Sequence, residues 1–409
     1  MNRFLQWLSP AGRQSNKLSH PATDIVPAIG RAQEWKHYSG PMVALHGLSD
    51  AAWSPPSAAA LTREGFGRNP VVYRCVRLVS EAAASMPWLM YDDTAEITTH
   101  PVLELLHRPS PLRSGCEFLE TLFGHMLVSG NAYVQLIAHD GELRELHLLR
   151  PDQVRVVTDT DGWPQAYEYG EGNRRHRFEI EEQNPTILHL ALFNPLDELC
   201  GMPPLTAAHM ALDIHNSASR WNKALLDNSA RPSGALVYNA PEASNLTPEQ
   251  FERLKSELEE GYSGPARAGR PMLLEGGLDW KAMGFSPKDM DFIEAKNGAA
   301  RDIALAFGVP PMLLGIPGDL TYANYQEANR ALWRQTVLPL ASRVAASLGN
   351  WLSGHGGENF RLDFDRDGVE ALASDREALW KRLNEATFLT DDEKRQAAGY
   401  GVGEPVEIN

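Results

Sequence analysis

The fold is decided by the stretch S-P-K-D-M-D-F-I-E-A-K-N-G-A-A-R-D-I-A-L-A-F-G-V-P-P (286–311), continued by M-L-L-G-I-P-G-D-L-T-Y-A (312–323). A serine cap at Ser286 followed by proline is typical of a helix start, and Asp289 stands where a capping-box acid would. Apolar residues then recur at spacings of three and four, on one helical face: Phe292, Ala295, Ala299, Ile303 and Phe307. Gly308 and the prolines behind it end this predicted helix.

A second, longer helix is predicted from Asn324 to Leu352. Glu327 lies three residues after Asn324 and completes a capping box. Pro339 removes one backbone donor from the middle of this helix and clashes with the preceding turn, so we expect a kink near 335–339. The stripe expected to be buried consists of Ala328, Leu332, Leu338, Ala341, Ala345, Leu348 and Leu352.

The segment between the two predicted helices is longer than an ordinary connection. Helix–helix links usually have about two to eight residues, whereas Gly315 to Tyr325 is a polar and aromatic run with Gly and Pro before it. Long loops inside compact units are usually functional. We therefore expect this loop to make contacts with a partner, although the helix–loop–helix unit carries no catalytic side chain.

The composition is that of a folded globular chain. It has 409 residues, 43% of them hydrophobic and 22% charged, and its length predicts roughly two or three domains. No apolar run reaches the ~18 residues of a membrane span, and the N-terminus lacks the apolar core of a signal peptide. Three widely separated cysteines (Cys75, Cys116 and Cys200) favour neither disulfides nor zinc. We expect a protein made in the cytosol, with no membrane, metal or cofactor partner.

The charge balance is acidic, with a net charge of −15 and a pI near 5.4. Tight binding to nucleic-acid phosphates needs a basic footprint, so this balance argues against it. The balance leaves open a passage through which nucleic acid slides without adhering.

Secondary-structure patterns divide the rest of the chain. A poorly ordered arm is expected over 1–65, where turn formers interrupt every period. Order is expected from Asn69, a cap followed by proline, with one helix ending at Pro87 and a second at Gly130. The pattern then changes to strands, beginning with a hairpin around the Asp140-Gly141 turn and continuing at 154–158, 165–169, 175–180 and 186–190. The pattern predicts an α+β region with an antiparallel sheet.

A compact insert is predicted between two helices, 204–228 and 287–307. It contains a strand at 235–238, a helix capped by Thr247 with Gln250 completing the box, and a strand pair before 285. Two helices that lead to a small module and back form a stalk with a tip. The C-terminal tail is expected to add a strand at 360–364 and two helices, 369–388 and 391–398.

Motifs with catalytic or metal-binding potential have plainer interpretations. D-F-D-R-D-G (363–368) resembles half of an EF-hand loop, but Ser374 stands at the twelfth position and a strand precedes it, which favours solvated acids. G-H-G-G (354–357) lacks the Lys-Ser/Thr of a P-loop, and G-x-S-x-G and H-E-x-x-H are absent. Four histidines without further ligands at zinc spacing are interpreted as ordinary side chains: His100, His107, His209 and His215. The sequence indicates no active site.

A set of short motifs in fixed order carries a family resemblance: N-P-V-V-Y-R-C-V (69–76), S-G-N-A-Y-V (129–134), G-M-P-P-L (201–205), L-T-P-E-Q (246–250), F-S-P-K-D-M-D-F-I-E (285–294), I-A-L-A-F-G-V-P-P-M-L-L-G (303–315) and T-Y-A-N-Y-Q-E-A (321–328). The chain resembles the portal proteins of tailed bacteriophages, in their HK97-type branch, from about Asn69 to Arg382. Its short length and small C-terminal part are similar to the portals of alphaproteobacterial gene transfer agents.

The resemblance implies an α+β portal fold with a wing of helices and antiparallel sheet, a helical stem, a small α/β clip, a long kinked helix and a short helical crown. The implied parts are an N-terminal arm 1–65, wing 66–203, stem helix 204–232, clip 233–285, stem helix 286–309, tunnel loop 310–323, kinked helix and wing strand 324–365, and crown 366–409.

The resemblance also implies roles for individual residues. The tunnel loop is expected to project toward DNA (Ile316, Asp319, Leu320, Thr321 and Tyr322), and Pro339 marks the helix kink. The clip is expected to dock partners through Glu252, Lys255, Glu259 and Tyr262. The loop carries Asp319 and no Lys or Arg, so a firm grip on phosphates is not expected.

The resemblance further implies partners and a place of action. Copies of the chain are expected to form a ring, commonly of twelve subunits, at one vertex of the capsid, with double-stranded DNA passing through it. The large terminase, which hydrolyses the ATP, a head-completion or adaptor protein and the major capsid protein are the implied partners. The protein is expected in the virion, after assembly in the bacterial host cytoplasm, without enzymatic activity or a cofactor of its own.

Two other classes of protein remain open on the sequence alone. A ring-forming head–tail adaptor or scaffold without DNA passage would share the helical stalk but would need no exposed central loop. A hydrolytic enzyme would need a convergent cluster of acids or a nucleophile, and the sequence shows neither.

The acidic balance generates a testable prediction for a twelve-copy ring. Such a ring would carry a formal charge of about −180, from −15 per copy, and would repel the DNA backbone while letting it slide. Replacing lumen-facing acids by their amides is expected to slow DNA passage, measured as packaged DNA per unit time. Unchanged packaging in these variants would contradict the hypothesis.

Overall fold

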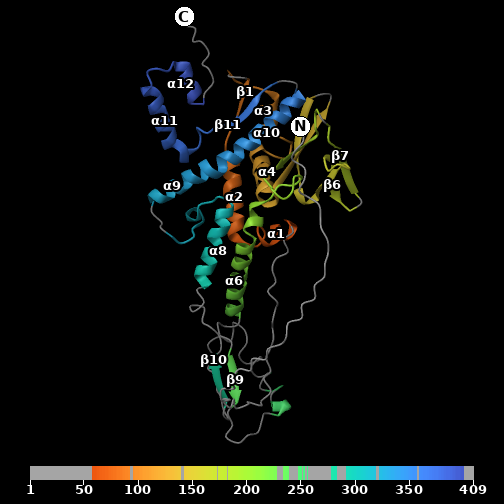
Figure 1. Cartoon of the computed structure of the whole chain (residues 1–409), viewed down its shortest axis with the longest axis vertical. Coiled ribbons are helices and arrows are strands. Elements are labelled where there is room, and N and C mark those ends of the chain that lie inside the picture. Colours follow the sequence, from red (N-terminus) through yellow and green to blue (C-terminus); the bar gives the residue numbers. More distant parts are fainter. Residues whose placement is uncertain are drawn as a thin grey trace, which may run out of the picture. The chain divides into compact units, whose positions relative to one another are not determined.

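The computed structural model describes residues 58–92, 95–139, 142–172, 174–181, 183–227, 234–238, 247–250, 252–253, 256, 278–282, 292–318, 322–356 and 359–399. In this part of the chain, helices combine with antiparallel sheets, as predicted (Figure 1). Helix α1 (Ala58–Glu64) lies within the segment expected to be poorly ordered, and its Leu61 is buried in the main core. Regular structure therefore begins earlier than the expected start at Asn69.

Two capped helices form the centre of the main core. Helix α2 (Pro70–Ala84) begins where predicted, because the Asn69 side chain accepts hydrogen bonds from the N–H groups of Val71 and Val72. Helix α4 (Gly115–Ser129) begins with a capping box formed by Ser114 and Glu117. The two helices pack against each other through buried side chains that include Val72, Val76, Val79, Phe118, Leu122 and Phe123.

A short helix, α3 (Pro101–His107), accounts for one of the sequence histidines. His100 is its N-cap, and its Nδ1 accepts a hydrogen bond from the N–H of Val102. The ring lies 5.4 Å from the ring of Phe360. His100 is therefore a capping residue.

Two three-stranded antiparallel sheets follow α4. The first has the order β4-β3-β8, and its predicted hairpin is confirmed: β3 (Asn131–His139), β4 (Glu142–Leu149) and β8 (Ile187–Ala191). The second has the order β5-β6-β7: β5 (Val154–Thr158), β6 (Pro164–Glu171) and β7 (Arg174–Glu179). A small separate core of Tyr133, Leu149, Tyr167 and Ile187 joins the sheets. All four strands predicted between 154 and 190 are present.

Gly130 and Gly201 meet backbone to backbone beside the first sheet. A Cβ at Gly201 would lie 2.1 Å from the carbonyl oxygen of Gly130, and a Cβ at Gly130 would lie 2.3 Å from the carbonyl oxygen of Gly201. Gly130 also has φ +79° at the end of α4. The Asn131 side chain fastens this crossing, since its Oδ1 accepts from the Gly201 N–H (2.7 Å) and contacts Nε2 of His189 (2.9 Å). Two motifs that carry the family resemblance are therefore in contact.

A third sheet, of order β11-β1-β2, joins distant parts of the chain. Strand β1 (Trp88–Asp92) was not predicted, and it pairs with the predicted β11 (Arg361–Phe364) and with β2 (Ala95–Glu96). The Trp88 and Phe364 rings stack at 4.1 Å. The partner strand lies far along the chain, so no local pattern marks β1.

The helix predicted over 204–228 is broken near its start. A single turn, α5 (Pro204–Ala207), is separated from α6 (His209–Asp227) by Ala208. Helix α8 (Phe292–Ala306) lies beside α6, and the rings of Trp221 and Phe292 stack at 4.2 Å (Figure 1). The predicted cap of α8 at Ser286 lies outside the described residues.

A buried polar contact ties α6 to the start of α2. Asn69 is 1% exposed, and its Nδ2 contacts Nδ1 of His215 at 3.0 Å and donates to Oδ1 of Asn216 at 2.9 Å. Burial, and after it the charge of Lys296, lowers the pKa of His215. The neutral ring can accept from the Asn69 amide, so the contact and the pKa shift are consistent.

A π-helical turn, η4 (Trp333–Val337), separates α9 (Tyr322–Leu332) from α10 (Leu338–Gly356), where the kink was predicted. The N–H of Leu338 donates to the carbonyl of Trp333, five residues earlier. Pro339, the next residue along the chain, has no N–H, so it cannot donate the hydrogen bond to the fourth preceding carbonyl that an α-helix requires. The predicted start at Asn324 was wrong, because Tyr322 and Ala323 are already helical.

The π turn also changes the buried stripe. Leu338, predicted to be buried, is only half-buried, whereas Val337 is fully buried together with Leu332. In an uninterrupted α-helix, positions five apart point about 140° away from each other. The wide turn accommodates one additional residue and brings Leu332 and Val337 onto the same side.

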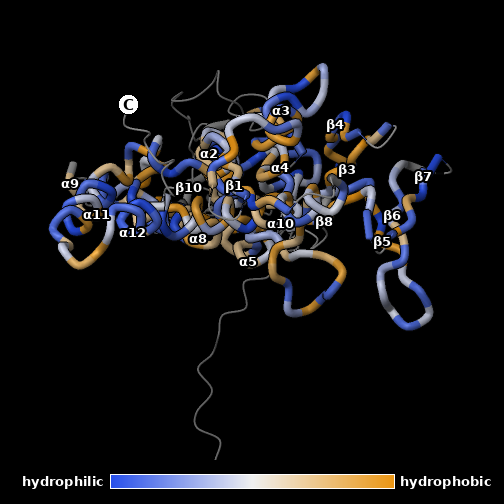
Figure 2. Tube along the Cα trace, turned by 90° about the horizontal axis from the view of Figure 1, so that it is seen from above, coloured by the Kyte–Doolittle hydropathy of each residue, from blue (hydrophilic) through white to orange (hydrophobic). Residues whose placement is uncertain are grey.

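The remaining elements are short. The insert contributes β9 (Gly234–Tyr238) and β10 (Leu278–Ala282), which pair antiparallel, and the predicted capping box of Thr247 and Gln250 is present. The C-terminal part contains η5 (Glu370–Leu372), α11 (Ala373–Glu385) and α12 (Asp391–Ala397). Figure 2 shows α11 and α12 as mainly hydrophilic.

The glycine crossing predicts a large effect of one added methyl group. Gly201→Ala is expected to destabilise the isolated chain by about 2–3 kcal/mol, because its Cβ would displace the Gly130 backbone. Gly124→Ala is the control, since nothing lies within 4 Å of its added Cβ, and alanine should stabilise α4 by up to about 1 kcal/mol. Urea unfolding measures both changes. Equal stabilities for the two variants would contradict the crossing.

Candidate functional site

The loop between α8 and α9 has a structured base. Its described part runs from Phe307 to Gly318 and contains a 3₁₀ turn, η3 (Pro311–Leu314). Gly315 ends this turn with φ +70°, a conformation that favours glycine. The described base of the loop therefore contains a defined turn.

The first fixed point of the loop is Gly308. Its carbonyl accepts a hydrogen bond of 2.6 Å from Oγ1 of Thr336, which lies in the π-helical turn. Gly308 has φ +65°, and a Cβ there would lie 2.6 Å from Thr336 Oγ1. The end of α8 and the irregular turn before α10 are therefore fitted to each other.

Two further contacts hold the loop on the side of α8. Nη2 of Arg301 donates to the carbonyl of Pro317 at 2.6 Å. The Ile316 side chain between these points is buried, with 8% exposed. Ile316 was expected to face a channel, but its side chain is buried within the isolated chain, and a position toward DNA stays a prediction.

The other predicted loop residues are only partly described. Tyr322 is the first residue of α9. Asp319, Leu320 and Thr321 lie outside the described residues, so their predicted positions toward DNA stay predictions. Arg301 and Thr336, which fix the loop, were missed by sequence reasoning because their partners are backbone carbonyls 16 and 28 residues away.

The predicted docking residues of the insert are also partly described. Glu252 lies in a helical, exposed position after the Thr247 capping box. Lys255, Glu259 and Tyr262 lie outside the described residues. The structure therefore provides one exposed acid in the region where docking was predicted.

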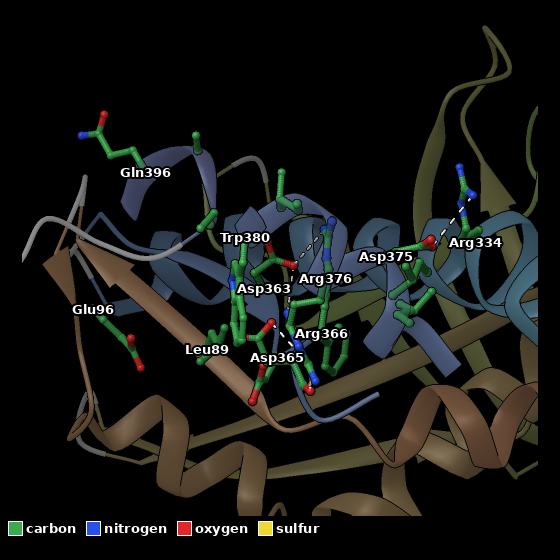
Figure 3. A pocket seen from close by; sticks show the side chains of 18 of the residues that line it. Leu89, Glu96, Arg334, Asp363, Asp365, Arg366, Asp375, Arg376, Trp380 and Gln396 are labelled. Carbon is green, nitrogen blue, oxygen red and sulfur yellow. Dashed lines mark hydrogen bonds and ion pairs between the residues drawn. The ribbon is translucent and has the colours of Figure 1, made fainter. Parts of the chain in front are cut away.

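A cavity of about 900 Å³ lies between the β1–β11 strands and the C-terminal helices (Figure 3). Five arginines and five acids line it, and several of them form ion pairs. Arg361 and Arg366 approach Asp363 at 3.4 and 3.6 Å, and Arg376 approaches Asp367 at 3.7 Å. Two acids of the EF-hand-like motif, Asp363 and Asp367, therefore take part in ion pairs beside this cavity.

The largest pKa shifts among the described residues favour neutral side chains. Burial raises the pKa of the Cys75 thiol to about 12 and lowers those of His125 and His189 to about 4. Burial also raises the pKa of Cys200. An activated thiolate needs the opposite shift. These groups do not form the activated constellation that the hydrolase alternative requires.

The described part of the chain contains neither a candidate membrane span nor a candidate metal site. No helix there is both long and apolar enough to cross a bilayer. No three His, Cys, Asp or Glu side chains in those residues come close enough together to hold a metal ion.

Comparisons with known proteins agree with the fold. The family model described as phage portal protein matches residues 70–399. The chain is 24% identical over 336 residues to the portal protein of Enterobacteria phage HK97, covering 80% of this chain and 77% of the phage protein.

Two solved structures are more similar. One is from the neck of an empty gene transfer agent (GTA) particle computed with C6 symmetry, with 51% identity and a TM-score of 0.68. The other is from the neck of a native GTA particle computed with C12 symmetry, with 50% identity and a TM-score of 0.66. Each match covers 86% of this chain and 96% of the other chain.

The chain belongs to the phage portal protein family. It is of the HK97 type, and its role is that of a portal protein, a subunit of the ring that provides the DNA channel at a capsid vertex. The family is one of structural assembly proteins. The α+β fold expected from the resemblance is confirmed.

Substitutions of Thr336 test whether its hydrogen bond to Gly308, and not its shape, holds the base of the loop. Thr336→Val keeps the branched shape but removes the donor to Gly308, at a cost of about 1 kcal/mol. Hydrogen exchange of the amides in 309–318 is expected to become about fivefold faster. Thr336→Ser keeps the hydroxyl and is the matched control. Equal exchange in the Val and Ser variants would show that the hydrogen bond does not hold the loop.

Proposed function

We propose that twelve copies of this chain form the portal ring of a gene-transfer-agent or phage particle, located at one capsid vertex and assembled in the bacterial host cytoplasm. The observation that carries the proposal is the match of 50% identity to a chain from a C12 particle neck, of which this chain covers 96%. Double-stranded DNA would enter and leave through the ring.

The tunnel-loop role belongs to the segment 310–323. Its base is held by hydrogen bonds from Thr336 and Arg301 and contains the buried Ile316, which supports a defined position for the start of the segment. Asp319 is the only charged residue in the segment. A loop without cations contacts DNA without binding phosphates tightly, which suits a sliding substrate.

A portal role also implies which proteins the ring would contact. The insert 233–285 would act as the clip, docking the large terminase during filling and a head-completion protein afterwards, and exposed Glu252 supports a polar contact there. The part 66–203 would act as the wing, toward the major capsid protein. The ring itself would be passive and not an enzyme, with ATP hydrolysed by the terminase.

A ring-forming adaptor without DNA passage is the second candidate. It would use the same helices α6 and α8 for assembly, but the anchoring of the α8–α9 loop would have no purpose in it. The fixed loop base therefore favours the portal.

Deleting Gly315–Ala323 separates the two candidates. Rings with a central channel are expected by negative-stain microscopy for both the wild-type chain and the deletion. Particles carrying the deletion are expected to lose DNA filling, measured as protected DNA per particle. Replacement of the segment by glycine and serine at equal length is the control for loop closure. Loss of ring assembly in the deletion would favour the adaptor, and a compact oligomer without a channel would contradict the portal.

A further inference from the structure

The C-terminal helices are weakly attached to the body. The structure describes all of α11 and α12, and none of their residues is buried. At the start of α11, Nη2 of Arg330 donates to Oγ of Ser374 at 2.6 Å, and its Nε approaches Asp375 at 3.8 Å. After the end of α12, the Tyr91 hydroxyl donates to the Gly399 carbonyl at 3.4 Å. Between these contacts, residues of both helices line the cavity described above.

The cavity has apolar as well as charged walls. Leu89 and Tyr91 line it from β1, and Leu379 and Trp380 line it from α11 (Figure 3). Trp380 is 47% exposed, although it is a large aromatic side chain. Packed interiors leave few voids larger than a water molecule, whereas about 900 Å³ is the size of a ligand pocket. The cavity therefore has room for a chain segment with both apolar and polar side chains.

Positive charge is concentrated at one point of the cavity. Arg361 and Arg366 both approach the carboxylate of Asp363, at 3.4 and 3.6 Å, so two cations share one acid. The cavity as a whole has as many acids as arginines, and the excess is local. The Arg361 guanidinium also lies 4.6 Å from the centre of the Tyr91 ring. A second carboxylate beside these two arginines would complete their pairing.

The chain reaches this cavity at the last residue that the structure describes. Gly399 lines the cavity and has φ +91°. The sequence continues as Y-G-V-G-E-P-V-E-I-N (400–409), with four apolar or aromatic side chains, two acids and no cation. Ten extended residues reach at most about 35 Å, which is enough to cross a cavity of this volume. The composition of the segment matches the mixed walls.

We propose that residues 400–409 occupy the cavity of their own chain and fasten α11 and α12 to the strands β1 and β11. Glu404 or Glu407 would complete the pairing of Arg361 and Arg366. The apolar side chains of the segment would pack between β1 and α11. This contact lies within one copy, so it does not depend on the proposed ring.

Connectivity favours this occupant over a free ligand or a segment of a second copy. Residues tethered at the wall of a cavity have an effective concentration there on the order of millimolar. Filling the cavity also removes apolar surface of β1 and α11 from water. A second copy would have to supply the same chemistry without the tether.

Photochemical crosslinking tests the occupant. Val406→Cys is made in the full chain, with Cys116→Ser and Cys200→Ser to remove the less buried thiols, and carries a thiol-reactive diazirine. Unlabelled and nitrogen-15-labelled chains are mixed before assembly, and mass spectrometry identifies the linked peptides. Crosslinks are expected to β1, β11 or α11, with both peptides of the same isotope. Thr160→Cys, on the exposed turn between β5 and β6, is the control and should give none of these crosslinks.

Two results of the crosslinking would overturn the proposal. Linked peptides of mixed isotope would assign the cavity to a segment of a second copy. Crosslinks that lie only outside β1, β11 and α11 would show that the segment does not enter the cavity. Neither result bears on the proposed function, because the contact is made within one chain.

Hydrogen exchange tests the fastening. Deleting 400–409 is expected to make amide exchange in α11 and α12 at least about tenfold faster, while exchange in α4 stays within about twofold. Glu404→Gln with Glu407→Gln should give about a threefold increase, because the amides lose the charge but keep the shape. Asp161→Asn with Glu198→Gln removes two exposed acids that do not line the cavity and is the control.

The exchange rates separate the two parts of the proposal. Unchanged exchange in the deletion would overturn the fastening of the helices. Faster exchange in the deletion, with the glutamine pair equal to the control, would overturn the pairing with Arg361 and Arg366.

Discussion

The close crossing of Gly130 and Gly201 is the constraint on which the body depends. A Cβ on either glycine would collide with the backbone of the other. The link between α4 and β3 can therefore contact the segment before α5 only because both residues lack a side chain. Asn131 then bonds to both the Gly201 N–H and His189. This one contact fixes where the first sheet begins and where the chain turns toward α6.

Some helix starts and one strand were predictable because their signals are local. Asn69, Ser114 and Thr247 cap helices through side chains that reach only two or three residues along the chain. Strand β5 has the predicted bounds because its alternation is short and continuous. Such features depend on neighbours in sequence and little on the rest of the fold.

The missed features depend on contacts made far along the chain. Strand β1 pairs with β11, and the loop base is held by hydrogen bonds from Arg301 and Thr336. Val337 is buried in place of Leu338 because a π turn shifts which residues face the core. A pattern based on 3.6 residues per turn cannot predict that shift. The candidate segment between α8 and α9 stays a prediction as a functional site, and its supports, Thr336 and Arg301, required the structure.

The pairing of β1 with β11 has a consequence for the insert. Strands from before and after the whole excursion through α6, the insert and α8 are joined in one sheet, so the body closes on itself without the module at the tip. The module is therefore an insertion in a body whose sheet is closed without it. The entropy of closing a connection grows only with the logarithm of its length, so the same body can carry inserts of different size while its own core stays unchanged.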